Sequence, residues 1–109
     1  MNDALSFKLQ ALADPTRRAI LARLKLGETS VNELAEPFAM SLPAVSKHLK
    51  VLETAGLITR SRNAQSRPCK LAKDGLNDVA LWMQNYHEMW EQRLDRLETY
   101  LEKLKETEK

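Results

Sequence analysis

The chain has 109 residues, 43% of them hydrophobic and 29% charged, a composition that predicts one globular domain with a small core. No apolar run is long enough for a transmembrane helix, and the N-terminus lacks the apolar segment of a signal peptide. Cys69 is the single cysteine, which excludes an internal disulfide framework and favours a reducing, cytoplasmic location.

The net charge of +2 is unevenly distributed along the chain. Residues 1–40 are neutral, residues 41–73 carry seven Lys or Arg against one Glu, and residues 74–109 carry five against nine acids. A local cation cluster is what binding to nucleic acid requires, because release of condensed counterions supplies most of the non-specific affinity. The basic segment therefore predicts a phosphate-binding surface, although a window of this length can also be basic by chance.

Two helices are expected at the start of the chain. Asp3 can cap a helix over residues 4–13, and Asp14-Pro15 can start a second that ends near Gly27. The first helix has two apolar stripes, one made of Leu5, Leu9 and Leu12, and the other, on the opposite side, of Ala4, Phe7 and Ala11. Two apolar faces predict that the core of the chain covers one face of this helix and that another surface covers the opposite face. The second helix carries Ile20, Leu21 and Leu24.

The stretch from Ser30 to Ile58 predicts two short helices joined by a tight turn. Ser30 stands three residues before Glu33, the spacing of a capping box, and Ser41 precedes Leu42-Pro43, a cap followed by an early proline. Gly56 is suited to the left-handed turn after the second of these helices. This layout, with lysines on the second helix, is typical of a helix-turn-helix DNA reader over residues 30–55.

The second helix of this pair is amphipathic in a way that suits the major groove. Its apolar stripe is Val45, Leu49 and Leu52, and the opposite side carries Pro43, Ser46, Lys47, Lys50 and Thr54. An ordinary solvated surface helix is the alternative. The outward face is small and basic with no acid before Glu53, so its side chains can reach base edges and phosphates.

A β-hairpin is expected next. The segment 57–62 is β-prone and alternating, residues 63–66 are turn-like, and 67–71 return as a strand with Pro68 at an edge. Arg60 and Arg62 alternate, so they are expected to leave one face together toward phosphate or the minor groove. The alternative is a surface hairpin with solvated arginines.

From Asp74 to about residue 106 the chain predicts one long helix. Its apolar residues follow steps of three and four: Leu76, Val79, Met83, Tyr86, Trp90, Leu94, Leu97, Leu101 and Leu104. About thirty residues of helix span roughly 45 Å, which so small a domain cannot cover. We therefore expect a two-fold dimer, with the alternative that the helix folds back onto its own core. The expected interface is Leu5, Phe7, Leu76, Val79, Trp82, Met83, Tyr86, Trp90, Leu94, Leu97 and Leu101.

The predicted fold class is mainly α with a small β-hairpin, a winged helix-turn-helix in a single domain. Residues 1–14 form an N-terminal dimer helix, 15–56 a helical core, 57–73 the wing and 74–106 the C-terminal dimerisation helix. The expected DNA-binding residues are Ser41, Leu42, Pro43, Ala44, Ser46, Lys47, His48, Lys50, Arg60, Arg62, Gln65 and Arg67. His48 lies beside the buried stripe, so its imidazole is expected to be packed or bonded to backbone.

These motifs resemble the ArsR/SmtB family of small winged-helix repressors. The resemblance is carried by ALADPTRRAIL (Ala11–Leu21), SVNELAEPF (Ser30–Phe38), MSLPAVSKHLKVLETAGLI (Met40–Ile58) and the R-x-R of the wing strand. It implies a homodimeric repressor that occupies an inverted-repeat operator until a signal releases it. It further implies base reading by Leu42, Pro43, Ala44, Ser46 and Lys47, with Lys50 and the wing as backbone anchors.

Many relatives in that family sense metals, and the ligands they use are missing here. The helix before the reading helix has no cysteine, and the last helix offers only Asp78, His87 and Glu88. Cys69, His48 and His87 are the chain's only thiolate or imidazole ligands, too few for a zinc or copper site. We therefore expect no metal and no cofactor. The resemblance then implies a repressor of the branch without metal sites, whose members often accompany a partner gene or repress their own.

Other functions remain as alternatives. One is a metal- or small-molecule-responsive sensor of the same fold, with a small apolar ligand at the dimer interface near Trp82, Tyr86 and Trp90. Another is a winged helix that serves only protein interaction. An enzyme is not expected, because no nucleophile–base pair, carboxylate pair or glycine-rich phosphate loop is present.

Overall fold

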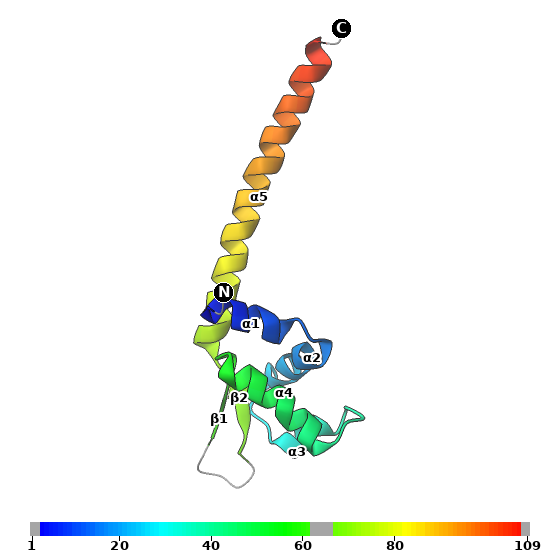
Figure 1. The fold of residues 1–109 in the computed structure, drawn as a ribbon, viewed down its shortest axis with the longest axis vertical. Helices are drawn as coiled ribbons and strands as arrows, with labels where there is room; N and C mark the ends of the chain where they lie inside the picture. Colours follow the sequence, from blue (N-terminus) through cyan, green and yellow to red (C-terminus); the bar gives the residue numbers. More distant parts are fainter. Residues whose placement is uncertain (1–2, 62–66, 108–109) are drawn as a thin grey trace. The chain divides into compact units, whose positions relative to one another are not determined.

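The computed structural model describes residues 3–61 and 67–107 (Figure 1). The elements in chain order are α1 (Ala4–Leu12), α2 (Pro15–Leu24), α3 (Val31–Ala35), α4 (Leu42–Thr54), β1 (Ile58–Arg60), β2 (Cys69–Leu71) and α5 (Lys73–Thr107). The chain divides into two compact units, Met1–Val79 and Ala80–Lys109. The predicted fold class, mainly α with a small hairpin, is confirmed. Within the described ranges, none of the helices combines the length and apolarity that a bilayer span requires.

The predicted caps start the helices. The Asp3 carboxylate accepts a hydrogen bond from the backbone N–H of Ser6 at 2.6 Å, and Asp14 accepts from that of Arg17 at 3.0 Å. The Ser41 hydroxyl accepts from the N–H of Ala44 at 3.3 Å, which fixes the first turn of α4. Each bond satisfies a backbone donor that the first helical turn leaves unpaired.

One stripe of α1 differs from the expectation. The sequence predicted that Ala11 and Phe7 share an apolar face of α1. The two residues differ, because Ala11 is fully buried in the core of its own unit whereas Phe7 is 45% exposed. The reason is that α1 packs on α4 as well as on α2. A side chain as small as alanine lets α1 approach closely, so only the Phe7 end of that stripe is left uncovered.

The end of α4 is a Schellman turn around Gly56. Gly56 has φ +79°, its N–H donates to the Glu53 carbonyl, and the N–H of Leu57 donates to the Leu52 carbonyl, both at 3.0 Å. Leu52 and Leu57 are both fully buried, which supplies the apolar contact that accompanies this motif. The turn sends the chain directly from α4 into the hairpin.

The hairpin is antiparallel and shorter than predicted, with Ile58 paired to Leu71, Thr59 to Lys70 and Arg60 to Cys69. Cys69 also exchanges both backbone hydrogen bonds with Thr29, at 3.1 and 2.8 Å. The segment before α3 therefore anchors the second wing strand.

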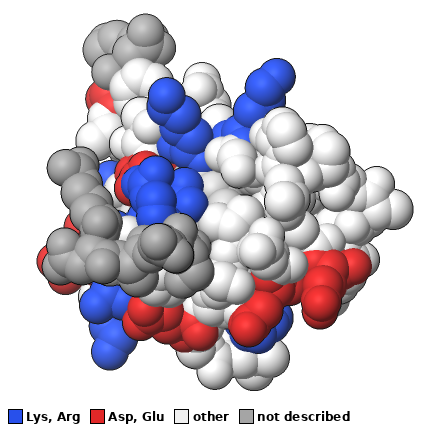
Figure 2. Space-filling view, turned by 90° about the horizontal axis from the view of Figure 1, so that it is seen from below, with Lys and Arg blue, Asp and Glu red and all other residues white. Residues whose placement is uncertain are grey.

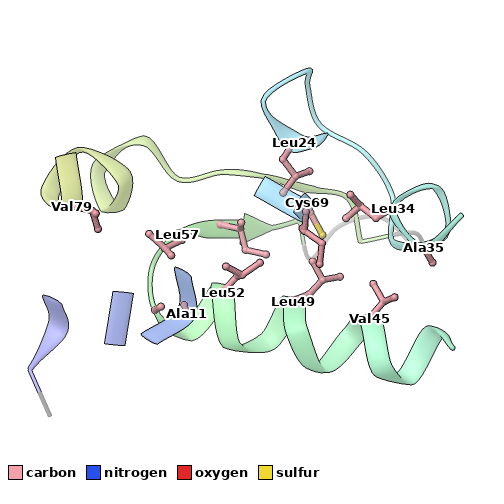
Figure 3. Close-up of a cluster of buried hydrophobic side chains, with 13 residues drawn as sticks. Ala11, Leu24, Leu34, Ala35, Val45, Leu49, Leu52, Leu57, Cys69 and Val79 are labelled. Atoms are coloured by element: carbon pink, nitrogen blue, oxygen red, sulfur yellow. The ribbon is translucent and has the colours of Figure 1, made fainter. Parts of the chain in front are cut away.

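The core of the first unit lies between α4 and the elements packed on it. Figure 3 shows Leu49 and Leu52 rising from α4 toward Cys69 and Leu57, and Val45 rising from the other end of α4 toward Ala35. The stripe predicted for this helix is thus its buried face: all three residues have no exposed surface. Burial of each such side chain contributes roughly 1.5–3 kcal/mol, which holds α4 with its opposite face outward.

The second unit is the remainder of α5. Every described residue from Ala80 to Thr107 is exposed. Aromatic rings contact one another along it: Trp82 and Tyr86 stack with centroids 5.2 Å apart, and Tyr86 and Trp90 meet edge to face with centroids 6.1 Å apart. This unit therefore buries no side chain of its own.

Candidate nucleic-acid interface

The outward face of α4 is open to solvent where sequence reasoning placed it. Leu42 is 48% exposed, Pro43, Lys47 and Lys50 are exposed, and Ala44 and Ser46 are half-buried. Ser41, the cap, is also exposed. The structure thus brings the expected reading residues of this helix onto one accessible side. The small residues near its start leave room for close approach to base edges.

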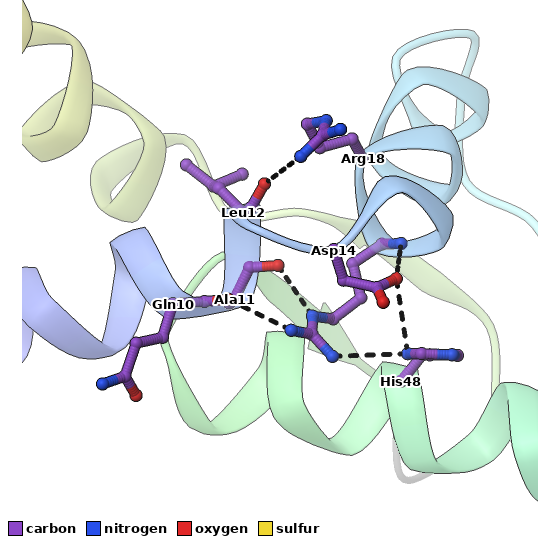
Figure 4. A network of polar contacts seen from close by, with 7 residues as sticks. Gln10, Ala11, Leu12, Asp14, Arg18 and His48 are labelled. Carbon is purple, nitrogen blue, oxygen red and sulfur yellow. Dashed lines mark hydrogen bonds and ion pairs between the residues drawn. The ribbon is translucent and has the colours of Figure 1, made fainter.

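His48 belongs to a side-chain network that sequence reasoning did not find (Figure 4). The guanidinium of Arg17 donates from Nε to the Ala11 carbonyl at 2.7 Å, from Nη2 to the Gln10 carbonyl at 3.1 Å, and from Nη1 to Nδ1 of His48 at 3.4 Å. Arg17 thereby joins the C-terminal end of α1 to the reading helix. His48 was expected to be packed or bonded to backbone; it is half-buried, and its partner is a side chain of α2 instead of the backbone.

Arg17 and Asp14 both lie close to Nδ1 of His48. A guanidinium can only donate, so its contact with His48 requires Nδ1 as the acceptor. Asp14 Oδ2 lies 3.9 Å from the same Nδ1, too far for a hydrogen bond. The Asp14 carboxyl has its pKa held below the ordinary value, mainly by the backbone N–H of Arg17. The His48 side chain is 20% exposed and directed into this network.

Among the described residues of the wing, Arg60 is less accessible than expected. Arg60 lies opposite buried Cys69 and two residues after buried Ile58, so it shares their face and is half-buried, with its Nε shielded from solvent. The alternation of the strand was predicted, but not that the face with Arg60 is turned toward the core. Arg67 and Lys70 are exposed. Arg62 and Gln65, two predicted contacts, lie outside the described residues.

Lys and Arg side chains are distributed over the face seen in Figure 2. Two of them project at the top of this view, and others lie among the Asp and Glu side chains farther down. Of the described residues in α4, Lys47 and Lys50 have no ion-pair partner. Unpaired, solvated lysines are available to replace condensed counterions on a phosphate backbone.

Residues with metal-binding chemistry are scattered. Among the described residues, no three His, Cys, Asp or Glu side chains lie close enough together to hold a metal ion. His87 pairs with Glu91 at 3.0 Å on the same exposed helix face. Cys69 is fully buried, and burial raises the pKa of its thiol, which disfavours the reactive thiolate.

The predicted interface residues fall into two groups. Val79 is 5% exposed and Leu76 packs against the core, so both pack within the chain itself. Leu5 is half-buried. Those farther along α5 are 39–57% exposed: Trp82, Met83, Tyr86, Trp90, Leu94, Leu97 and Leu101. We call this group the α5 ridge.

The fold and this site define a winged helix-turn-helix protein of the DNA-binding type. A family model described as a helix-turn-helix domain matches residues 12–61. The chain is 39% identical over 77 residues to the transcriptional repressor SdpR of Bacillus subtilis, covering 71% of this chain and 86% of SdpR. It is 51% identical over 67 residues, 62% of its length, to the HTH-type transcriptional regulator Rv2034 of Mycobacterium tuberculosis, of which it spans 63%.

Solved structures agree. An ArsR family transcriptional regulator, RHA00566, superposes with a TM-score of 0.76 at 43% identity, covering 82% of this chain and 98% of that one. The homodimeric winged helix-turn-helix DNA-binding domain of Mb0332 from Mycobacterium bovis superposes with a TM-score of 0.64 at 29% identity, covering 79% and 81%. The chain belongs to the ArsR/SmtB family of transcriptional regulators.

Proposed function

We propose that two copies of this chain form a repressor that binds an inverted-repeat operator, including one at its own promoter. The observation that carries the proposal is the outward face of α4, which a buried stripe and a serine cap hold in place. That face presents small residues near its start and two unpaired lysines after them, Lys47 and Lys50.

The residues divide by the chemistry they offer to DNA. Leu42, Pro43 and Ala44, with Ser46 and Lys47, enter the major groove, where apolar groups meet thymine methyls and Ser or Lys reaches base acceptors. Lys50 and the wing cations contact phosphates, which set register without reading sequence. Arg17 and His48 act indirectly, because their network fixes the orientation of α4.

Pairing of two copies is supported by the α5 ridge. Large apolar side chains repeat there at heptad-like spacing and none is buried within the chain. An apolar surface this long is what an interface covers. Pairing through it makes a two-fold dimer that presents two reading helices to one duplex. Mb0332, a neighbour in fold, is described as homodimeric.

Lys47 supplies the first test. In a mobility-shift titration of promoter DNA, Lys47→Ala should bind the specific site roughly tenfold more weakly while its binding to random duplex changes much less. Lys25→Ala removes the same side chain from the exposed end of α2 and is the matched control. Equal losses on specific and random duplex would show that Lys47 does not read sequence.

The wing and the metal expectation are tested in the same assay. Arg62→Ala should weaken both kinds of binding and flatten the dependence of affinity on salt by about one charge.

Zinc and chelator should leave operator affinity unchanged. A metal-dependent release would reject the proposal that the repressor works without a metal.

A further inference from the structure

A groove of about 560 Å³ lies between α1 and α4, within the first unit. Its apolar part is formed by Phe7, which the sequence also predicted in the dimer interface, and by Val51 and Ala55. In the single chain Phe7 and Val51 are 45% and 41% exposed. Neither large side chain packs in the core, although each stands on a helix that does. The described residues that line it are Phe7, Gln10, Arg17, Lys47, Lys50, Val51, Thr54 and Ala55.

The charges around this groove have one sign. Arg17, Lys47 and Lys50 line it, and none of the described residues that line it is acidic. Arg17 is held by the Ala11 and Gln10 carbonyls, so its guanidinium is already ordered and a ligand need not immobilise it. Lys47 and Lys50 have no ion-pair partner among the described residues.

An apolar floor beside three cations selects a particular kind of ligand. Phosphate of the DNA backbone uses only the cations and gains nothing from Phe7 and Val51. A ligand with a flat apolar body and an anionic end uses both, because the ring covers the floor and the anion meets the lysines. The volume is within the range of small-molecule sites.

We propose that this groove binds an aromatic carboxylate and that the bound carboxylate releases the DNA. The inference rests on the proposed function for its consequence, since Lys47 and Lys50 serve both the groove and the operator. The carboxylate occupies the lysines that DNA needs, so ligand and operator exclude each other. The effect is reciprocal: the ligand lowers the affinity for operator DNA by some factor, and operator DNA lowers the affinity for the ligand by the same factor.

The probe is 2-naphthoate, titrated by calorimetry into the full chain without DNA. We expect saturable binding, and about fivefold weaker binding of the uncharged analogue 2-naphthylmethanol, because the lysine contacts are partly exposed. Equal affinity for the two compounds, or no saturable binding, overturns the proposal. This titration contains no DNA, so its failure is distinct from failure of operator binding.

The variant Val51→Glu tests the location of the ligand site, because it puts a carboxylate into the groove at an exposed position. Binding of 2-naphthoate should fall at least about tenfold. Leu26→Glu makes a similar exchange at a residue that is 81% exposed and lies outside the groove. This control variant should bind 2-naphthoate as tightly as the wild type does. Unchanged affinity in Val51→Glu overturns the site.

The second arm uses the operator. Saturating 2-naphthoate should weaken operator binding by the wild type and leave that of Val51→Glu unaffected. If 2-naphthoate does not bind and Val51→Glu instead weakens self-association, the groove is covered by a second copy and the ligand site is rejected.

Discussion

Replacement of Arg17 by methionine isolates the network that joins α1, α2 and α4. Methionine keeps an apolar stem and removes the guanidinium, so the loss is that of its hydrogen bonds. The bond to the Ala11 carbonyl is 2.7 Å long and partly buried, whereas the bond to the Gln10 carbonyl is exposed and the bond to His48 is long. A partly buried bond from a charged donor contributes about 1.5–3 kcal/mol. We therefore expect the free energy of unfolding to fall by about 2 kcal/mol.

Arg18 provides a control on the same helix. Its guanidinium also donates to a carbonyl of α1, that of Leu12 at 2.8 Å, but this bond is exposed. Arg18→Met should therefore change the free energy of unfolding by no more than about 0.5 kcal/mol. Urea unfolding followed by circular dichroism measures both variants, at one fixed chain concentration because a dimer's stability depends on it. Losses of equal size would refute the assignment of Arg17 as the joint between these helices.

Three further predictions concern stability and reactivity. Gly75→Ala should lower the melting temperature, because an added Cβ would lie 1.9 Å from the Gly56 carbonyl oxygen. That clash outweighs the gain of about 1 kcal/mol in helix propensity that alanine brings. A higher melting temperature would contradict this prediction. Cys69 should react with an aromatic disulfide reagent much more slowly in the native chain than in urea, since burial raises its pKa, and rapid native reaction would contradict this. The Asp14 carboxyl has a lowered pKa in the folded state. The stability that its charge contributes is therefore complete above the ordinary pKa of 3.8 and is lost as the pH falls through the pKa of the folded state. The stability difference between wild type and Asp14→Ala should therefore be larger at pH 7 than at pH 2, and equal differences would contradict it.

Local signals in the sequence predicted most of the fold. Asp3, Asp14 and Ser41 cap helices through their own neighbours, and Gly56 supplies the one backbone conformation that its turn requires. These features depend on residues within one or two helical turns, so the sequence contains them directly. The outward face of α4 follows from its periodicity for the same reason.

The features that were missed depend on contacts between distant segments. Arg17 meets His48 across 31 positions, and nothing in either local pattern indicates it. The burial of Ala11 requires α4, and the inward face of Arg60 requires the Cys69 pairing. Periodicity likewise could not show that the apolar series of α5 changes its role after Val79, because a residue buried in the core and one exposed on the surface keep the same spacing.

Selection of bound duplexes from a random pool tests most directly whether paired α4 helices read DNA. The account predicts convergence on an inverted repeat with half-site centres about 10 base pairs apart, or a multiple of one turn, occupied by two chains per duplex. Convergence on a single half-site bound tightly by one chain, or on no common sequence, would contradict it.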